Sequence, residues 1–264
     1  MSLSTLANNV GYSDEVVSQN KLWLYQINVQ IDALDFDLSY EFEKDVIEQV
    51  SIAYLAVSRH FYVELDEMRY LDFNIRLIED YTRFINIQKQ EVGRVISRTG
   101  YYSLDNGQIT VLKTRSNAET FRTLKHETCH RVLHQNTNNR ALWLNEGIAE
   151  NCEFAQYDYV KGKVVINPNN VNHNYVETML NKDKLIPLKK LLNWTGLEQQ
   201  FAENSILNQV QSGEFIYYLL KSPESSYWFS DLLQQEGGYL DMQQAQILDR
   251  LIALQVEFEQ WVKY

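Results

Sequence analysis

The chain has 264 residues, with 24 Lys and Arg against 35 Asp and Glu, so its formal net charge is −11. A protein this acidic repels phosphate backbones, and the densest basic pair is only Lys189–Lys190, so we expect no nucleic-acid partner. Hydrophobic residues make up 45% of the chain, and 3 Pro and 10 Gly are few, which together predict a globular, helix-rich protein. No apolar run approaches the ~18 residues that a membrane span requires.

The first residues, Met1 to Ser4, lack the basic and apolar regions of a signal peptide. This predicts a cytoplasmic protein, or a periplasmic or secreted one if a signal peptide has been removed. The compartment and the oligomeric state stay open at this stage. Two cysteines are too few for the disulfide framework of a small secreted domain.

The first half of the chain predicts a mixture of strands and helices. Apolar alternation predicts strands over 22–31 and 73–77, and apolar residues at helical spacing predict helices over 42–59 and 81–88. The stretch 92–112 reads as strands around a turn, because Asp105-Asn106-Gly107 is a strong hairpin signal.

The second half is predicted to be mostly helical. Ser116 and Glu119 form a capping box for a helix that runs to about Gln135, and Asn145 is the expected N-cap of a helix through Phe154. Further helices are expected over 174–181, 187–193 with Pro187 in the first turn, 208–221, 225–235 and 240–262, after a polar loop at 167–174.

These elements predict one α+β domain over residues 1–264. An α/β part covers about 20–135 and contains a small mixed sheet with a hairpin edge strand. A helical part covers about 140–264.

The chemistry is concentrated in the segment His126-Glu127-Thr128-Cys129-His130, inside the helix that Ser116 caps. Residues i and i+4 of a helix lie about 40° apart around its axis and about 6 Å apart along it, so both imidazoles reach one ion. Zinc prefers such nitrogen ligands and leaves one position for water at catalytic sites. Glu127 is placed to take a proton from the water that the ion activates.

A second segment, Trp143-Leu144-Asn145-Glu146-Gly147-Ile148-Ala149-Glu150, follows after enough residues for a helix to return beside the first. Glu146 is then the expected third ligand of one zinc ion per chain. Glu150, one turn later, is expected to accept a hydrogen bond from the free ring nitrogen of a ligand histidine. Taken alone, the two glutamates would be ordinary first-turn carboxylates.

On these residues the chain resembles the gluzincin zinc metallopeptidases, which are thermolysin-like and aminopeptidase-N-like enzymes. It is most similar to the peptidase-MA-like families of poorly characterised bacterial proteins. The resemblance is strong over about 100–154, weaker over the C-terminal half and weak before residue 70. It implies a zincin-like fold, zinc ligands His126, His130 and Glu146, the general base Glu127, and the supporting carboxylate Glu150.

The resemblance also implies two features of substrate handling. A strand beside the active-site helix would pair with an extended peptide, with Tyr101, Tyr102, Ile109 and Val111 as the candidate residues. A Tyr or His from the C-terminal half would stabilise the oxyanion, yet no tyrosine stands just before Gln211-Ser212, where related families usually carry one. The remaining candidates for that role are Tyr157, Tyr159, His173, Tyr175, Tyr217 and Tyr218, although Tyr217 and Tyr218 also suit ordinary helix packing.

Other polar residues have simpler interpretations. Cys129 reads as a buried core thiol, with a bridge or redox-sensitive pair to Cys152 as the alternative. His134 is expected outside the ligand set, and His60 reads as structural or exposed. Asp32, Asp35 and Asp37 lack the spacing of a calcium loop and read as a solvated turn.

The sequence therefore predicts a zinc-dependent peptidase that acts on a peptide or protein substrate, with endopeptidase action as a mild preference. The acidic surface predicts a preference for basic or neutral peptides. Two alternatives stay open. One is a zinc-bound scaffold that binds peptides or cell-wall polymers with little cleavage, and the other is a purely structural helix without metal.

Overall fold

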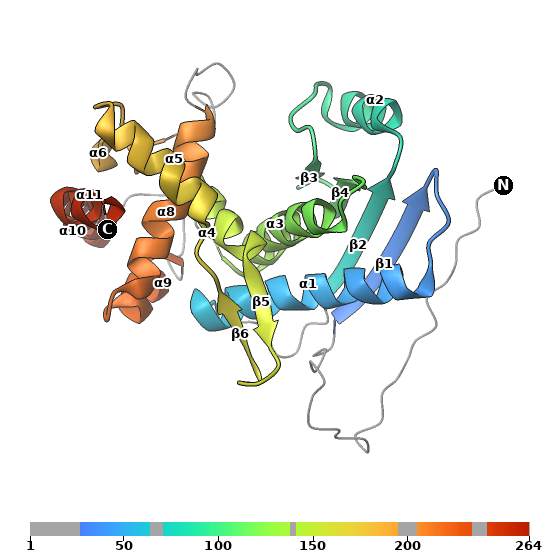
Figure 1. Ribbon diagram of the computed structural model, residues 1–264, viewed down its shortest axis with the longest axis horizontal. Helices are drawn as coiled ribbons and strands as arrows, with labels where there is room; N and C mark the ends of the chain where they lie inside the picture. The colour runs from blue at the N-terminus through green and yellow to red at the C-terminus, as the bar shows by residue number, and fades with distance from the viewer. Residues whose placement is uncertain (1–26, 64–70, 138–140, 195–204, 234–241, 264) are drawn as a thin grey trace.

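The computed structural model describes residues 27–63, 71–137, 141–194, 205–233 and 242–263 (Figure 1). The elements up to the two central helices are β1 (Ile27–Leu34), α1 (Tyr40–His60), β2 (Leu71–Ile78), α2 (Tyr81–Val92), β3 (Gly100–Tyr102), β4 (Gln108–Leu112), α3 (Asn117–Asn136) and α4 (Leu142–Glu153). The later elements are β5 (Ala155–Asp158), β6 (Lys163–Ile166), α5 (Asn170–Asn181), α6 (Leu188–Leu191), α8 (Ser205–Lys221), α9 (Ser225–Leu233), α10 (Met242–Ala253) and α11 (Gln255–Val262).

The larger sheet is mixed and has the strand order β1-β2-β4-β3. β1, β2 and β4 are parallel, while β3 runs antiparallel to β4 and forms the edge of the sheet. Phe73, Ile75 and Leu77 of β2 are buried in one apolar cluster with residues of α1 and α3. Ile78 belongs to a separate cluster with Phe84 of α2, so both faces of the sheet are covered.

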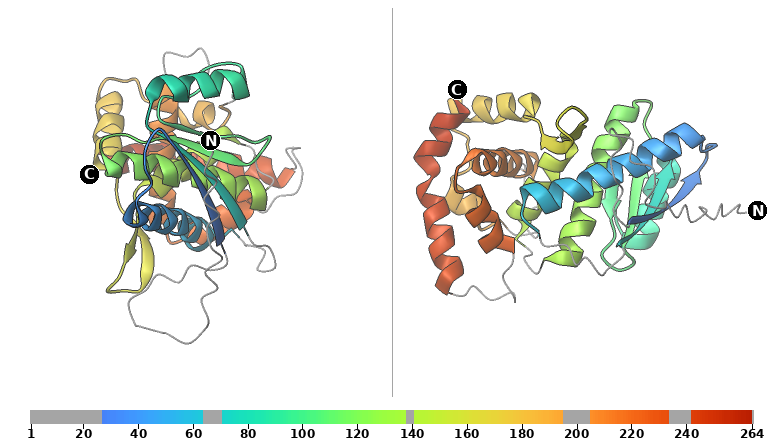
Figure 2. Two further views of the ribbon diagram at one scale, coloured as in Figure 1. Left: turned by 90° about the vertical axis from the view of Figure 1, so that its right-hand side faces the viewer. Right: turned by 90° about the horizontal axis from the view of Figure 1, so that it is seen from below.

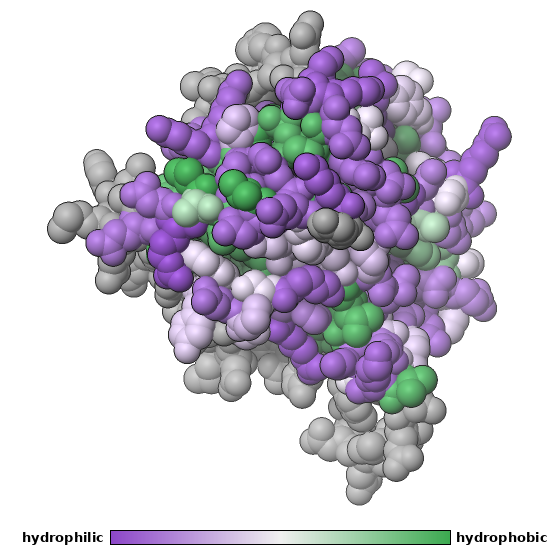
Figure 3. All heavy atoms as spheres, turned by 60° about the vertical axis from the view of Figure 1, so that its left-hand side comes forward, coloured by the Kyte–Doolittle hydropathy of each residue, from purple (hydrophilic) through white to green (hydrophobic). Residues whose placement is uncertain are grey.

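α3 and α4 lie between this sheet and the C-terminal helices (Figures 1 and 2). α4 packs against α3 on one side and α8 on the other. The surface over the C-terminal helices is mainly hydrophilic, with apolar side chains in separate small areas (Figure 3). Within the described part of the chain, no helix combines the length and the hydropathy that crossing a bilayer would require.

The mixture of helices with a small mixed sheet confirms the coarse prediction, and most predicted elements are present within a few residues. The predicted strand at 22–31 lies partly outside the described residues; its described part begins β1. Of the region 92–112, only β3 and β4 form strands. The hairpin turn at Gly107 has a φ of 69°, which a glycine adopts without strain.

Five predictions about the second half were wrong in detail. α4 begins at Leu142 with Ala141 as its N-cap, so Asn145 lies inside the helix. A two-stranded sheet, β5–β6, precedes the helices. α5 begins at Asn170, within the expected loop, because the Asn169 side chain caps it by accepting two backbone N–H groups. Pro187 is the N-cap of α6 rather than a residue of its first turn, and the expected helix 240–262 breaks at Leu254 into α10 and α11.

Candidate metal centre

α3 presents the two histidines of the motif to the same space. The hydroxyl of Ser116 accepts a hydrogen bond from the Glu119 N–H and starts the helix, as the capping signal predicts. One helical turn separates His126 from His130, and their ring centroids are 4.7 Å apart. Both side chains are largely buried, so water competes little for their ring nitrogens.

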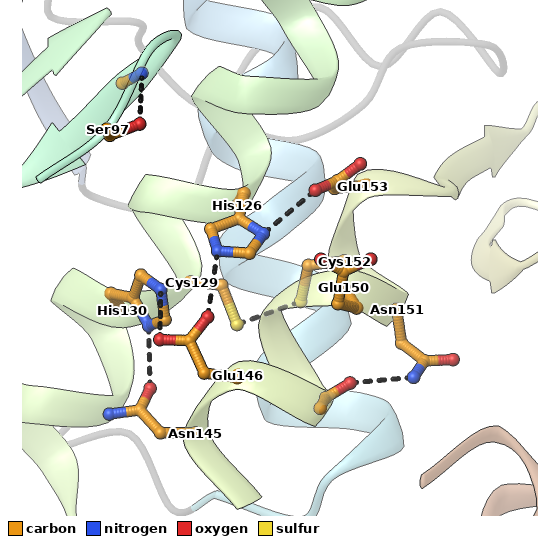
Figure 4. A network of polar contacts seen from close by, with 12 residues as sticks. Ser97, His126, Cys129, His130, Asn145, Glu146, Glu150, Asn151, Cys152 and Glu153 are labelled. Atoms are coloured by element: carbon orange, nitrogen blue, oxygen red, sulfur yellow. Dashed lines mark hydrogen bonds and ion pairs between the residues drawn. The ribbon is translucent and has the colours of Figure 1, made fainter. Parts of the chain in front are cut away.

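Glu146 of α4 faces both rings (Figure 4). Its two carboxylate oxygens lie 3.5 Å from His126 Nε2 and 3.8 Å from His130 Nε2. The three residues offer ligand atoms within 4.8 Å of one another. Sequence positions up to twenty residues apart therefore converge on one point, as the two motifs predict.

The donor set fits zinc in chemistry and spacing. Two imidazole nitrogens and one carboxylate are a common catalytic zinc set, and bonds of about 2.0–2.1 Å in a tetrahedron put neighbouring ligand atoms about 3.3 Å apart. The distances of 3.5 and 3.8 Å from the histidines to Glu146 are close to that value. Small side-chain adjustments would bring all three ligand atoms into range.

The Nδ1 atoms of both histidine rings, which are the nitrogens not facing Glu146, also form hydrogen bonds. His126 Nδ1 donates to Glu153 Oε1 at 2.9 Å, and His130 Nδ1 donates to Asn145 Oδ1 at 2.7 Å. With the proton on Nδ1, the Nε2 lone pair of each ring is free for a metal. The role predicted for Glu150 thus falls to Glu153, because that residue reaches the ring from the last turn of α4.

Asn145 and Glu153 are site residues that the sequence interpretation missed. Asn145 was assigned to the helix cap, although its place directly before Glu146 was available as a signal. Glu153 stands seven residues after Glu146, and Glu146, Glu150 and Glu153 therefore follow one face of α4.

Glu150 has a different partner. Its Oε2 accepts a hydrogen bond of 2.9 Å from the Asn172 side chain of α5. Burial, followed by the neighbouring charge of Glu153, raises the pKa of Glu150 to about 7. One carboxylate oxygen of Glu150 still lies within 4.8 Å of a ring nitrogen of His126 and of a carboxylate oxygen of Glu153. Glu150 therefore contributes to the charge around the His126 ring.

Buried carboxylates give the site an excess of negative charge. Burial raises the pKa of Glu127, and that residue is only 8% exposed. Burial acts in the same direction on Glu146, but His130 and His126 outweigh it and lower the pKa of Glu146. Ionised groups that are buried this deeply need compensation. A divalent cation between His126, His130 and Glu146 would supply it.

Two glycines allow α4 and α8 to pack closely against each other. A Cβ at Gly147 would lie 2.7 Å from the Ser212 carbonyl oxygen of α8, and one at Gly213 would lie 2.8 Å from Glu150 Cβ. The Asn151 amide donates to the carbonyls of Gly147 and Gly213 at 2.8 and 2.7 Å and ties the helices together. The Gly that follows Glu146 in the sequence therefore has a packing role.

The edge strand β3 runs beside the part of α3 that contains Thr123 and Glu127. A Cβ at Gly100 would lie 2.4 Å from Thr123 Cγ2 and 3.3 Å from Glu127 Cγ, so only glycine permits this approach. The Thr99 carbonyl oxygen accepts a hydrogen bond from the Leu112 N–H, and the Ser103 N–H donates to the Gln108 carbonyl oxygen. In an antiparallel pair, this pattern turns the backbone groups of Gly100 and Tyr102 toward the outer edge.

Of the four proposed substrate-strand residues, Tyr101 and Tyr102 lie in this edge strand and the other two do not. Ile109 and Val111 are fully buried in β4, which pairs with β2 and β3 on its two sides, so their strand cannot accept a peptide. Tyr101 points away from α3 and donates to Glu91 Oε2 at 2.6 Å. The Tyr102 hydroxyl lies 3.0 Å from His134 Nδ1 on α3.

Most oxyanion candidates are engaged away from the ligand set. Tyr159 donates to Glu48 of α1, and the Tyr157 ring packs 4.9 Å from the Tyr159 ring. Tyr217 and Tyr218 pack against Trp261, which confirms their helix-packing interpretation. Tyr175 is partly buried against the apolar core.

His173 is the candidate with a polar environment near Glu150. Its Nδ1 lies 2.7 Å from Glu214 Oε1, and Glu214 is buried. Asn172, the preceding residue, donates to Glu150, and Gly213, which precedes Glu214, packs on Glu150.

The remaining polar residues match their simpler interpretations. Cys129 and Cys152 are buried free thiols with sulfur atoms 3.0 Å apart. His60 Nε2 lies 2.9 Å from the Val164 carbonyl oxygen and joins α1 to β6. Asp35, in the turn after β1, pairs with Arg83 at 2.5 Å. Asp32 lies inside β1 rather than in a turn, 4.0 Å from Arg76 of β2.

Comparison with known proteins adds no relative: no protein-family model matches the chain, and no curated protein matches it.

Proposed function

We propose that this protein is a zinc-dependent peptidase with a zincin-like fold, similar to the gluzincins. The observation that carries the proposal is the convergence of His126, His130 and Glu146, with a hydrogen bond on the outer nitrogen of each ring. Residues from two helices meet there with the donor types and spacing of a catalytic zinc set. The buried Glu127 beside them supplies the base that hydrolysis needs.

When bound, zinc supplies Lewis-acid chemistry, since it polarises a carbonyl group and lowers the pKa of a water molecule. The Glu127 carboxylate would accept a proton from the attacking water and pass it to the leaving amine. Burial raises the pKa of Glu127 above its ordinary value, which suits a group that must hold this proton between the two steps. Asn145 and Glu153 keep the two imidazoles oriented.

The substrate is an extended peptide that pairs with the outer edge of β3. The carbonyls of Gly100 and Tyr102 and the N–H of Tyr102 would bind its backbone without regard to side chains, while the Gly100 N–H donates to Ser97 Oγ at 3.2 Å. Because Gly100 packs on Glu127, a peptide on this edge passes directly over the base.

Replacing Glu127 by Gln tests the proposal. Loss of the general base should lower kcat by about 10²–10⁴-fold, while zinc content stays near one per chain. Glu119→Gln is the matched control, because it removes a carboxylate from the first turn of the same helix. Turnover is followed with a peptide library and mass spectrometry. Full activity of the Glu127→Gln protein would refute the mechanism.

A zinc-bound scaffold with little cleavage is the second candidate. It is favoured by the contacts of Tyr157, Tyr159, Tyr217 and Tyr218, which are packed against other side chains. A library digest separates the candidates: specific cleavage that a chelator abolishes excludes pure binding. Retention of peptides without cleavage, at full zinc occupancy, would favour the scaffold.

A further inference from the structure

Arg131 extends the line of α3 residues that faces β3. Thr123, Glu127 and Arg131 are spaced by four residues and therefore lie on one side of α3. Thr123 and Glu127 lie against Gly100, in the space that a Cβ of another residue would need. Two residues along β3, Tyr102 turns its side chain to the same helix, where its hydroxyl lies 3.4 Å from Arg131 Nη1. Helix and strand therefore run side by side from the base to the guanidinium.

The guanidinium is held in place, and among the described residues it has no carboxylate partner. No ion pair of Arg131 with an acidic side chain is present within the described ranges, although acidic residues outnumber basic ones by 35 to 24. Its Nε is buried without a hydrogen-bond partner in the described structure. Gly107 of the hairpin turn covers the group, because a Cβ there would lie 3.2 Å from Arg131 Cζ.

The spacing of residues along α3 and β3 places the Arg131 guanidinium near a peptide bound to the edge of β3. One turn of helix, from Glu127 to Arg131, rises about 6 Å, and two residues of an extended strand span about 6.6 Å. A peptide lying along Gly100 and Tyr102 therefore brings a side chain or terminus near Arg131, about two residues from the group that faces Glu127.

We propose that Arg131 is a specificity determinant that binds a carboxylate of the substrate, about two residues from the cleaved bond. This inference rests on the proposed peptidase function and names its substrate class. Guanidinium binds carboxylate through two parallel hydrogen bonds and exchanges poorly with lysine in that role. The preference is opposite to the one that the net charge of −11 predicts.

Two carboxylate sources share this chemistry: an Asp or Glu side chain and the free C-terminus of a peptide. Two pairs of peptides separate them. One pair carries Glu or Gln at the positions flanking the cleavage site, and the other ends in a free acid or an amide. The pair whose discrimination depends on Arg131 identifies the source.

The test compares kcat/KM within each peptide pair for the wild-type protein and for Arg131→Gln. We expect the wild type to favour the carboxylate member of one pair by about tenfold or more, and the ratio to fall to near one in Arg131→Gln. Arg131→Lys should restore only part of the ratio. Arg122→Gln removes a charge from the exposed side of the same helix, where Arg122 lies over the Phe154 ring, and should keep the preference.

A binding assay keeps this inference separate from the peptidase proposal. The same peptides, labelled with a fluorophore, are titrated by anisotropy into Glu127→Gln and into Glu127→Gln/Arg131→Gln. Cleavage without a carboxylate preference, or a preference that survives Arg131→Gln, overturns the role of Arg131 and leaves the peptidase intact. Arg131-dependent carboxylate binding without any cleavage overturns only the peptidase. Equal binding within both pairs, with no cleavage, overturns both.

Discussion

The α3–α4 contact and the α5–α8 contact each place a histidine against a glutamate, partly buried in the first and buried in the second, but the results differ. Between α3 and α4, Glu153 holds His126 Nδ1 at 2.9 Å, and the other ring nitrogen faces Glu146. Between α5 and α8, Glu214 holds His173 Nδ1 at 2.7 Å, and the ring stands edge-on to Trp261. Within the described ranges, His173 belongs to no group of three metal-ligating side chains.

The difference shows what a metal site requires beyond its residue types. A carboxylate on one ring nitrogen fixes the tautomer in both places. Only at His126 do a second imidazole and a second carboxylate meet the remaining nitrogen. The α5–α8 pair is suited instead to hydrogen bonding or charge stabilisation.

The largest expected effect tests whether the His173–Glu214 pair between α5 and α8 contributes to catalysis at the candidate metal centre. If His173 stabilises the oxyanion, His173→Phe should lower kcat by about 10²–10³-fold and leave zinc content unchanged. The variant keeps a ring against Trp261, so packing is largely retained. Steady-state kinetics beside a metal assay measure both quantities. Unchanged kcat would assign the pair to structure alone.

A smaller effect is expected from removing the hydrogen bond between Glu153 of α4 and His126 of α3. Glu153→Ala removes the hydrogen-bond acceptor of His126 Nδ1, and we expect zinc affinity to fall by about 10–100-fold. Glu150→Gln is the comparison, because Glu150 bonds Asn172 and should alter zinc affinity less. Competition with a coloured chelator gives both affinities. If Glu150→Gln has the larger effect, Glu150 supports His126 as the sequence predicted.

The sequence alone predicts most of the candidate metal centre because the geometry of that site is local. A helix places His126 and His130 on one side without regard to the rest of the chain, and a helix that returns beside it brings Glu146 close. The choice between Glu150 and Glu153 depends on the packing of α4, since both lie on its inward face. Gly147 and Gly213 set that packing through contacts with α8 that no local pattern encodes.

The surroundings of the candidate metal centre were predicted less well. The hairpin signal placed β3 and β4 correctly, but which strand forms the edge depends on the parallel pairing of β4 with β2, which comes from a distant part of the chain. Ile109 and Val111 were therefore misassigned. The six oxyanion candidates lie on elements whose positions depend on tertiary packing, and sequence alone could not rank them.

Metal content tests the central claim most directly. The protein is purified without added metal or chelator and analysed by inductively coupled plasma mass spectrometry, beside His130→Ala and His134→Ala. Both variants remove an imidazole from α3, but His134 contacts Tyr102 and lies outside the ligand group. We predict about one zinc per chain in the wild type and in His134→Ala, and almost none in His130→Ala. Absence of zinc from the wild type even after zinc is supplied, or equal zinc in all three proteins, would contradict the account.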